Sequence, residues 1–184
     1  MKKRVFYIPL FILLVIFVLA GCSGEPDKGA PATNDGDGTV SPGPDITLPP
    51  AVFSFKMGDI FIEMDEDISK IITGLGEPLG ILEAPSCAFD GTDRIFSYPG
   101  IQIYTYPKNG ADHIHTIGFF DDSVVTAEGK IRLGSNIQSV FDAYGNDYRY
   151  ETGMYTFTRG KTVLEFLVSD DIIIGITYRY LLDL

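Results

Sequence analysis

The chain has 184 residues, of which 45% are hydrophobic and 12% aromatic, and 25 Asp and Glu outnumber 14 Lys and Arg to give a formal net charge of −11. This acidity argues against nucleic-acid binding, because the phosphate backbone would be repelled, and the length favours one compact domain. Two histidines, two cysteines and no tryptophan leave few residues for metal or thiol chemistry. We therefore expect no cofactor.

The first 21 residues have the pattern of a secretory signal peptide. Lys2, Lys3 and Arg4 precede an uncharged run from Val5 to Ala20, which is shorter than the ~20 residues of a membrane-spanning helix. The run ends in Leu-Ala-Gly-Cys at residues 19–22, which resembles the bacterial lipobox. The resemblance implies cleavage after residue 21 and attachment of a diacylglyceryl group to Cys22. Two acyl chains hold a protein stably on a membrane, so we expect a lipid-anchored protein on the extracytoplasmic face of the cell membrane.

The segment after the signal peptide predicts a spacer. Residues 23–50 contain six prolines, five glycines and four aspartates, and they hold few large apolar side chains. Such a composition cannot bury enough apolar surface to offset the entropy of ordering the chain. We expect residues 22–50 to be the lipidated cysteine with a disordered linker and residues 51–184 to fold. Without residues 1–21 the chain keeps 11 basic and 25 acidic residues, a net charge of −14, which would hold the domain off anionic lipid.

An internal repeat predicts two helices. Residues 64–76 align without a gap on residues 133–145, and both segments place apolar residues at positions i, i+3, i+4 and i+7. Both segments end at glycine, which is typical of a helix C-terminus. Polar side chains that can cap the first turn come at the start of each: Asp65, Glu66 and Asp67 in one, and Ser135 and Asn136 in the other.

Period-two apolar patterns around these helices predict strands. They cover residues 52–55, 60–62, 94–98, 101–106 and 114–120 with the first helix, and 130–133, 154–158, 162–168 and 172–180 with the second. The prediction is an α+β domain of two tandem repeats, at about 51–122 and 123–184. Each repeat would be a strand, a short helix and a three-stranded antiparallel meander, with the helices packed on one face of the sheet.

The paired helix motif and its strands resemble three groups of proteins. These are the BamE-like (SmpA/OmlA) lipoproteins, the tandem-repeat fold of β-lactamase inhibitory protein and, most of all, paired-repeat lipoproteins of Gram-positive bacteria. The resemblance covers most of residues 55–184 and implies an α+β repeat fold in the cell envelope. The chain departs from these folds in having one clear helix per repeat, and it lacks the disulfides of the inhibitor.

Two histidines are the weak candidates for a metal site. His113 and His115 alternate on a predicted strand, which would place both imidazoles on one face. Conceivable third ligands are Asp112, Asp121, Asp122 and Cys87. The alternative, which we favour, is a solvated or edge-strand pair with no metal.

Cys87 and the tyrosines complete the candidates. A nucleophilic Cys87 would need His113 or His115 as its base, and we favour a small buried side chain instead. Tyrosines on an open sheet face would form a surface of the kind enriched at interfaces, whereas half-buried strand tyrosine is the ordinary alternative. Tyr104, Tyr106 and Tyr155 are the first candidates for partner contact.

The sequence therefore favours a non-catalytic lipoprotein that binds a protein or envelope component through an exposed sheet face. The alternatives are an inhibitor of a secreted hydrolase and a small envelope hydrolase that uses His113 and His115. A sharp apolar pocket that encloses both histidines would favour the hydrolase, whereas a wide, flat, tyrosine-lined sheet would favour the binding protein.

Overall fold

A computed structural model describes residues 50–183, which all belong to one compact unit. The signal peptide, Cys22 and all of the linker except Pro50 lie outside the described residues. Within residues 50–183, no helix has both the length and the apolar character needed to cross a lipid bilayer.

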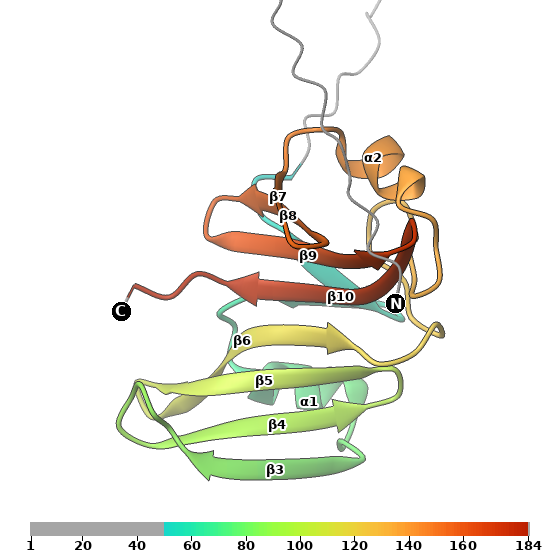
Figure 1. Cartoon of the computed structure of the whole chain (residues 1–184). Helices are drawn as coiled ribbons and strands as arrows, with labels where there is room; N and C mark the ends of the chain where they lie inside the picture. Colours follow the sequence, from blue (N-terminus) through green and yellow to red (C-terminus); the bar gives the residue numbers. More distant parts are fainter. Residues whose placement is uncertain (1–49, 184) are drawn as a thin grey trace, which may run out of the picture. The chain divides into compact units, whose positions relative to one another are not determined.

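The fold is α+β, with two short helices and a large antiparallel sheet (Figure 1). The hairpin formed by β1 (Ser54–Met57) and β2 (Ile60–Glu63) stands apart from this sheet. Eight strands follow one another across the sheet in the order β3-β4-β5-β6-β10-β9-β8-β7. Their bounds are β3 Gly80–Pro85, β4 Thr92–Tyr98, β5 Ile101–Lys108, β6 Ala111–Phe119, β7 Arg149–Glu151, β8 Met154–Arg159, β9 Thr162–Ser169 and β10 Ile172–Tyr180.

Both expected helices form, and their ends follow the expected chemistry. In α1 (Ile68–Leu75), the Asp67 carboxylate accepts a hydrogen bond from the Ser69 N–H at 2.9 Å. In α2 (Gln138–Tyr144), the Asn136 side chain accepts one from the Gln138 N–H at 2.9 Å. Each helix stops at a glycine with positive φ, 85° at Gly76 and 78° at Gly145, a conformation that costs glycine little.

The residues just before each helix pair with a strand. Strands β6 and β10 pair with each other only over Thr116–Gly118 and Thr177–Arg179. Outside that stretch, the edge of each strand bonds to the segment that precedes a helix. The bonds run from Asp65 N to Ile114 O (2.8 Å), Ile114 N to Glu66 O (2.9 Å), Gly134 N to Ile173 O (2.8 Å) and Ile173 N to Ser135 O (2.9 Å).

Three strand predictions differ from the structure. Strands β3 and β7 were not expected, so four strands follow each helix in place of three. Every residue of these two strands is exposed, which removes the apolar alternation that marks a half-buried strand. Residues 130–133 form no strand; Ile131 is buried at 1% exposure in a loop, where its N–H donates to the Thr126 hydroxyl.

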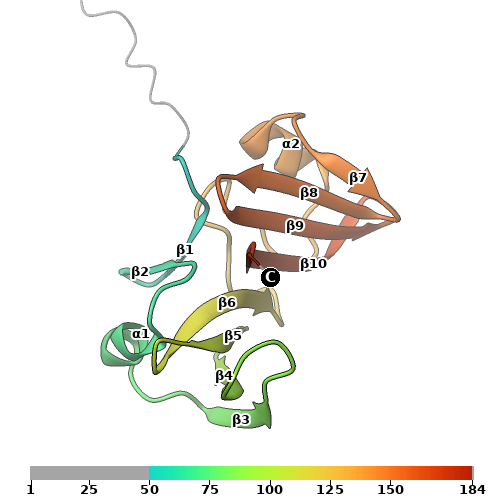
Figure 2. The same ribbon diagram turned by 90° about the vertical axis from the view of Figure 1, so that its left-hand side faces the viewer.

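One hydrophobic core collects buried side chains from the sheet, the hairpin and both helices. Strand β5 shows the alternation: Ile101 and Ile103 are buried, whereas Gln102 and Tyr104 are partly exposed. Helix side chains Ile68, Ile71 and Val140 join the same core. Figure 2 shows hairpin β1–β2 and α1 beside the first half of the sheet, β3–β6. Among residues 50–183, neither helix nor the hairpin lies on the opposite face of that half.

A buried tyrosine allows a test of this core. Tyr178 is 1% exposed, its Oη has no hydrogen-bond partner among residues 50–183, and burial raises the pKa of its hydroxyl well above the usual value. Tyr178→Phe removes a desolvated hydroxyl at nearly constant volume, so we expect the free energy of unfolding to rise by about 1 kcal/mol in urea denaturation.

Tyr98 supplies the matched control, because its Oη donates to the Gly76 carbonyl at 3.0 Å. Tyr98→Phe should lower the free energy of unfolding by about 1 kcal/mol. An equal loss of unfolding free energy in the two variants would show that the Tyr178 hydroxyl forms a hydrogen bond in the folded protein.

Candidate functional site

A pocket of about 880 Å³ lies on the open face of the first half of the sheet. Strands β4 and β5 form its floor through paired outward side chains such as Ile95 and Tyr104. The loop at 86–91, between β3 and β4, and the chain after β10 form its walls. Its apolar lining residues are Leu82, Ala84, Ala88, Phe89, Ile95, Leu181 and Leu182, and this composition and size suit a small-molecule site.

Two of the three predicted tyrosines line this pocket. The Tyr104 hydroxyl donates to Gln102 Oε1 at 3.0 Å. Tyr106 is only 7% exposed, and its ring centroid lies 5.0 Å from that of Phe89. Tyr155 lies in β8, in the other half of the sheet, where its ring packs 5.5 Å from Phe141 of α2.

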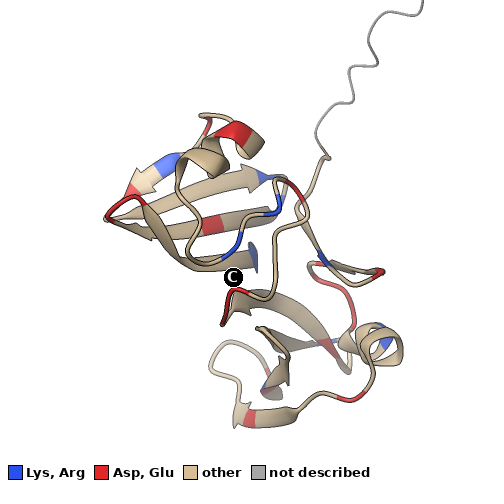
Figure 3. Ribbon diagram, turned by 90° about the vertical axis from the view of Figure 1, so that its right-hand side faces the viewer, with Lys and Arg blue, Asp and Glu red and all other residues tan. Residues whose placement is uncertain are grey.

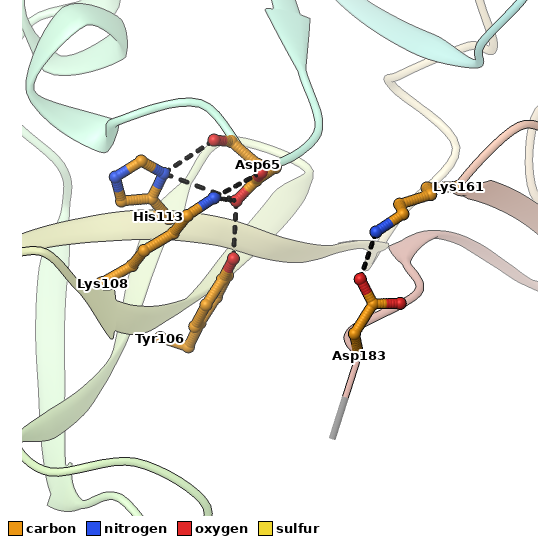
Figure 4. A network of polar contacts seen from close by, with 6 residues as sticks. All are labelled: Asp65, Tyr106, Lys108, His113, Lys161 and Asp183. Atoms are coloured by element: carbon orange, nitrogen blue, oxygen red, sulfur yellow. Dashed lines mark hydrogen bonds and ion pairs between the residues drawn. The ribbon is translucent and has the colours of Figure 1, made fainter.

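Figure 4 shows a polar network around Asp65, and one member of this network, Tyr106, also lines the pocket. The Asp65 carboxylate accepts hydrogen bonds from the Tyr106 hydroxyl at 2.6 Å and from Lys108 Nζ at 2.6 and 2.8 Å. Burial raises the pKa of Asp65, but the bonds from Lys108 and Tyr106 lower it more, so it lies below its usual value. Burial and the bond to Asp65 raise the pKa of Tyr106. The network ties the segment before α1 to β5.

The two histidines have different partners. Both rings lie near Tyr106, at centroid distances of 6.2 Å for His113 and 6.3 Å for His115. His113 Nδ1 donates to the Asp65 carbonyl at 2.7 Å. His115 lines the pocket at a β-bulge opposite Tyr104 and Thr105 and pairs through Nδ1 with Thr116 Oγ1 at 3.0 Å. Burial, and then the charge of Arg179, lower the pKa of His115, which favours its neutral form.

The conceivable third metal ligands are dispersed. Asp112 pairs with Arg94 at 2.5 Å, and Asp121 accepts a hydrogen bond from the Ser123 N–H at 2.9 Å. The part of the chain that the structure describes contains no group of three or more His, Cys, Asp or Glu placed to hold a metal ion.

The prediction of a buried Cys87 is wrong. Its side chain is exposed in the loop between β3 and β4, because this loop extends from the edge of the sheet, where no helix or hairpin covers it. The neighbouring residues Ser86, Ala88 and Phe89 line the pocket. Ser86 Oγ accepts long hydrogen bonds from the Ala88 and Phe89 N–H groups, at 3.4 and 3.3 Å, and so shapes the turn.

Four charged residues line the pocket, and none of them was among the predicted site residues: Glu83, Asp93, Arg94 and Arg179. Arg179 lines the pocket and pairs with Glu165 at 2.5 Å. Asp93 also lines it, and its Oδ1 is buried without a hydrogen-bond partner in the described residues. Residues two apart on a strand lie on the same face, so Asp93 shares the face of Ile95. The predicted strand began at Arg94, one residue after Asp93, and for this reason Asp93 was missed.

Charge elsewhere is spread over the molecule. Figure 3 shows Asp and Glu on strands, turns and α2 across both halves of the sheet.

No protein-family model, curated protein or solved structure matches this chain.

Proposed function

We propose that this chain is a lipid-anchored, non-catalytic binding protein of the cell envelope, which contacts its ligand or partner through the open face of β3–β6. The observation that carries the proposal is the 880 Å³ pocket on that face. Pockets of this size with apolar walls and a few polar groups are typical of binding sites.

The sequence supports the envelope location. A signal-peptide pattern ends in a lipobox at Cys22, and about 28 linker residues separate that cysteine from the folded domain. In this arrangement, the acyl chains would hold the protein on the membrane while the linker lets the acidic domain stand away from anionic lipid.

The pocket geometry favours binding over hydrolysis. Ser86, Asp93 and His115 line the same pocket, the residue types of a nucleophile–base–acid triad. Such a triad needs hydrogen bonds from nucleophile to base and from base to acid. Here His115 Nδ1 pairs with Thr116, and Asp93 Oδ1 has no partner among the described residues. We therefore propose that these groups bind a ligand and transfer no proton.

The domain is also proposed to be a duplicated unit, with the helix of each half on the same face of the sheet. Two observations support this organisation. Asp67 and Asn136, which are 69 residues apart, occupy equivalent helix starts and form isolated bridges with His113 and Ile172. The halves differ on their open faces, because the second half presents polar groups such as Arg149, Glu151 and Glu165 where the first presents apolar walls. Binding would then be a specialisation of the first half.

A position-specific cross-linking experiment tests both parts of the proposal. Benzoylphenylalanine replaces Tyr104 in the pocket, or Tyr150 as the control, in the full chain expressed in its own cells. Tyr150 is 58% exposed in β7, at the far edge of the sheet. After irradiation, mass spectrometry of the purified membrane-fraction chain should show a discrete adduct at position 104 and none at position 150.

The same experiment in the Cys22→Ala background tests the anchor. We expect the wild-type chain to carry an acyl mass and to begin at Cys22, whereas the Cys22→Ala chain should lack the acyl mass and keep residues 1–21 uncleaved. Equal adducts at 104 and 150 would contradict binding at this face, and the lack of an acyl mass in both forms would contradict the lipid anchor.

A further inference from the structure

We propose that the pocket binds a small amphiphilic amine, with its apolar body against the Leu82 and Ile95 side of the pocket and its N–H donor on the Asp93 carboxylate. This inference rests on the proposed function, because it assigns a ligand class to the same pocket. It depends on three features: an unpaired acid, the pairing of the other charges, and the exposed apolar walls.

Asp93 is the acceptor that lacks a donor. It lies at the start of β4, opposite Ala84 of β3, and lines the pocket. Its Oδ1 is buried, and residues 50–183 offer it no hydrogen-bond partner. A carboxylate that has lost water at one oxygen without gaining a donor is costly to bury, so a cationic head group held against Asp93 would be bound with an advantage that a fully solvated carboxylate would not give.

The other charged groups of the pocket already have partners. Glu83 pairs with Arg94 at 2.7 Å, and Arg179 pairs with Glu165 at 2.5 Å. The remaining titratable side chains of the lining are His115, which is paired with Thr116, and the tyrosines Tyr104, which donates to Gln102, Tyr106, which donates to Asp65, and Tyr180. Charge complementarity therefore favours a cation or an N–H donor at Asp93 and disfavours an anion.

The walls fit an apolar body. Leu82 is 64% exposed and Leu181 is 37% exposed, so large aliphatic side chains stay in contact with solvent at this pocket. Covering them with an alkyl or aryl group removes apolar surface from water, which is the main source of affinity in such sites. The volume of about 880 Å³ is that of a small-molecule pocket.

Three probes with one apolar body and different head groups test this inference: 4-phenylbutylamine, 4-phenylbutanol and 4-phenylbutyrate. Binding to the full chain in lipid nanodiscs is measured by equilibrium dialysis, and empty nanodiscs correct for partition into lipid. We expect the amine to bind about tenfold more tightly than the alcohol, because both head groups can donate to the Asp93 carboxylate but only the ammonium also brings a positive charge, and the carboxylate to bind most weakly.

Three variants test the role of Asp93 separately from the role of the pocket. Asp93→Asn should remove the preference for the amine and leave alcohol binding within about twofold, whereas Asp122→Asn, an exposed aspartate after β6, should behave as the wild type. Ala84→Phe places a ring in the pocket from an exposed position of β3 and should abolish binding of every probe.

The outcomes distinguish this inference from the proposed function. Probe binding that Ala84→Phe abolishes but that shows no amine preference, or an amine preference that survives in Asp93→Asn, overturns the inference alone. A position-104 adduct without specific binding of any probe also overturns the inference and leaves the binding function standing. Loss of both the adduct and specific probe binding overturns both.

Discussion

Phe55→Ala is expected to lower the free energy of unfolding by about 3–5 kcal/mol, because it leaves a cavity where the two halves of the sheet meet. Phe55 belongs to β1 and is fully buried, at 0% exposure. Its ring centroid lies 5.2 Å from that of Phe119 in β6 and 5.8 Å from that of Tyr178 in β10. The hairpin thus contributes a side chain that contacts both central strands.

The short pairing between the halves explains why this position should be sensitive. Strands β6 and β10 share only the register from Thr116–Gly118 to Thr177–Arg179, so side-chain packing beneath them carries much of their association. Urea denaturation followed by far-UV circular dichroism measures the loss. Phe61 of β2 is the control, because it is 59% exposed on the same hairpin, and Phe61→Ala should change stability by at most about 0.5 kcal/mol. Equal effects at both positions would place the hairpin outside the core.

The helices and their ends could be predicted from sequence because their signals are local. In each helix, the apolar spacing and the terminal glycine, Gly76 or Gly145, lie within a dozen residues. The cap acceptors are as local: Asp67 directly precedes α1, and Asn136 lies two residues before α2. The pairing of the segments ahead of the helices could not be predicted, because residues 65–66 and 134–135 form their hydrogen bonds with Ile114 and Ile173, far along the chain. No local pattern records such a pairing.

The missed strands have a related cause. Strands β3 and β7 lie at the two edges of the sheet and bury none of their residues, so they carry no apolar alternation. The opposite error at residues 130–133 arose because Ile131 and Leu133 alternate as they would in a strand. In the structure, Ile131 is a buried loop residue whose N–H donates to the Thr126 hydroxyl, and such a residue produces the same spacing as a strand.

The pocket could be predicted only in part. Tyr104 and Tyr106 follow from the alternation of one strand, but the pocket also needs Leu82, Asp93 and Leu181, which the sheet order brings to the same face. Tyr155 is also a tyrosine on a predicted strand, but it lies in the other half of the sheet, where it pairs with Tyr150 in β7. Residue type and spacing predict on which face of a strand a side chain lies, whereas the order of the strands in the sheet decides which side chains meet in one pocket.

Asp65→Asn is expected to lower the free energy of unfolding by about 2 kcal/mol at pH 7, because the amide loses charged hydrogen bonds to Lys108 and Tyr106. Asparagine tolerates the left-handed conformation of this residue, φ 66°, so the backbone should be kept. The effect should depend on pH. The folded-state pKa of Asp65 lies below that of the unfolded chain, so the carboxylate contributes stability above the unfolded value of about 3.9.

That contribution disappears as the pH falls through the folded pKa, so the difference between wild type and Asp65→Asn should be constant from pH 7 to pH 5 and should shrink below about pH 4. Urea denaturation from pH 7 down to pH 2.5 measures it. A double-mutant cycle with Tyr106→Phe isolates the hydroxyl–carboxylate bond, and we expect a coupling of about 1 kcal/mol at pH 7 that vanishes in acid. A difference that stays the same at pH 7 and pH 2.5 would mean that Asp65 acts through backbone conformation and not through its charge.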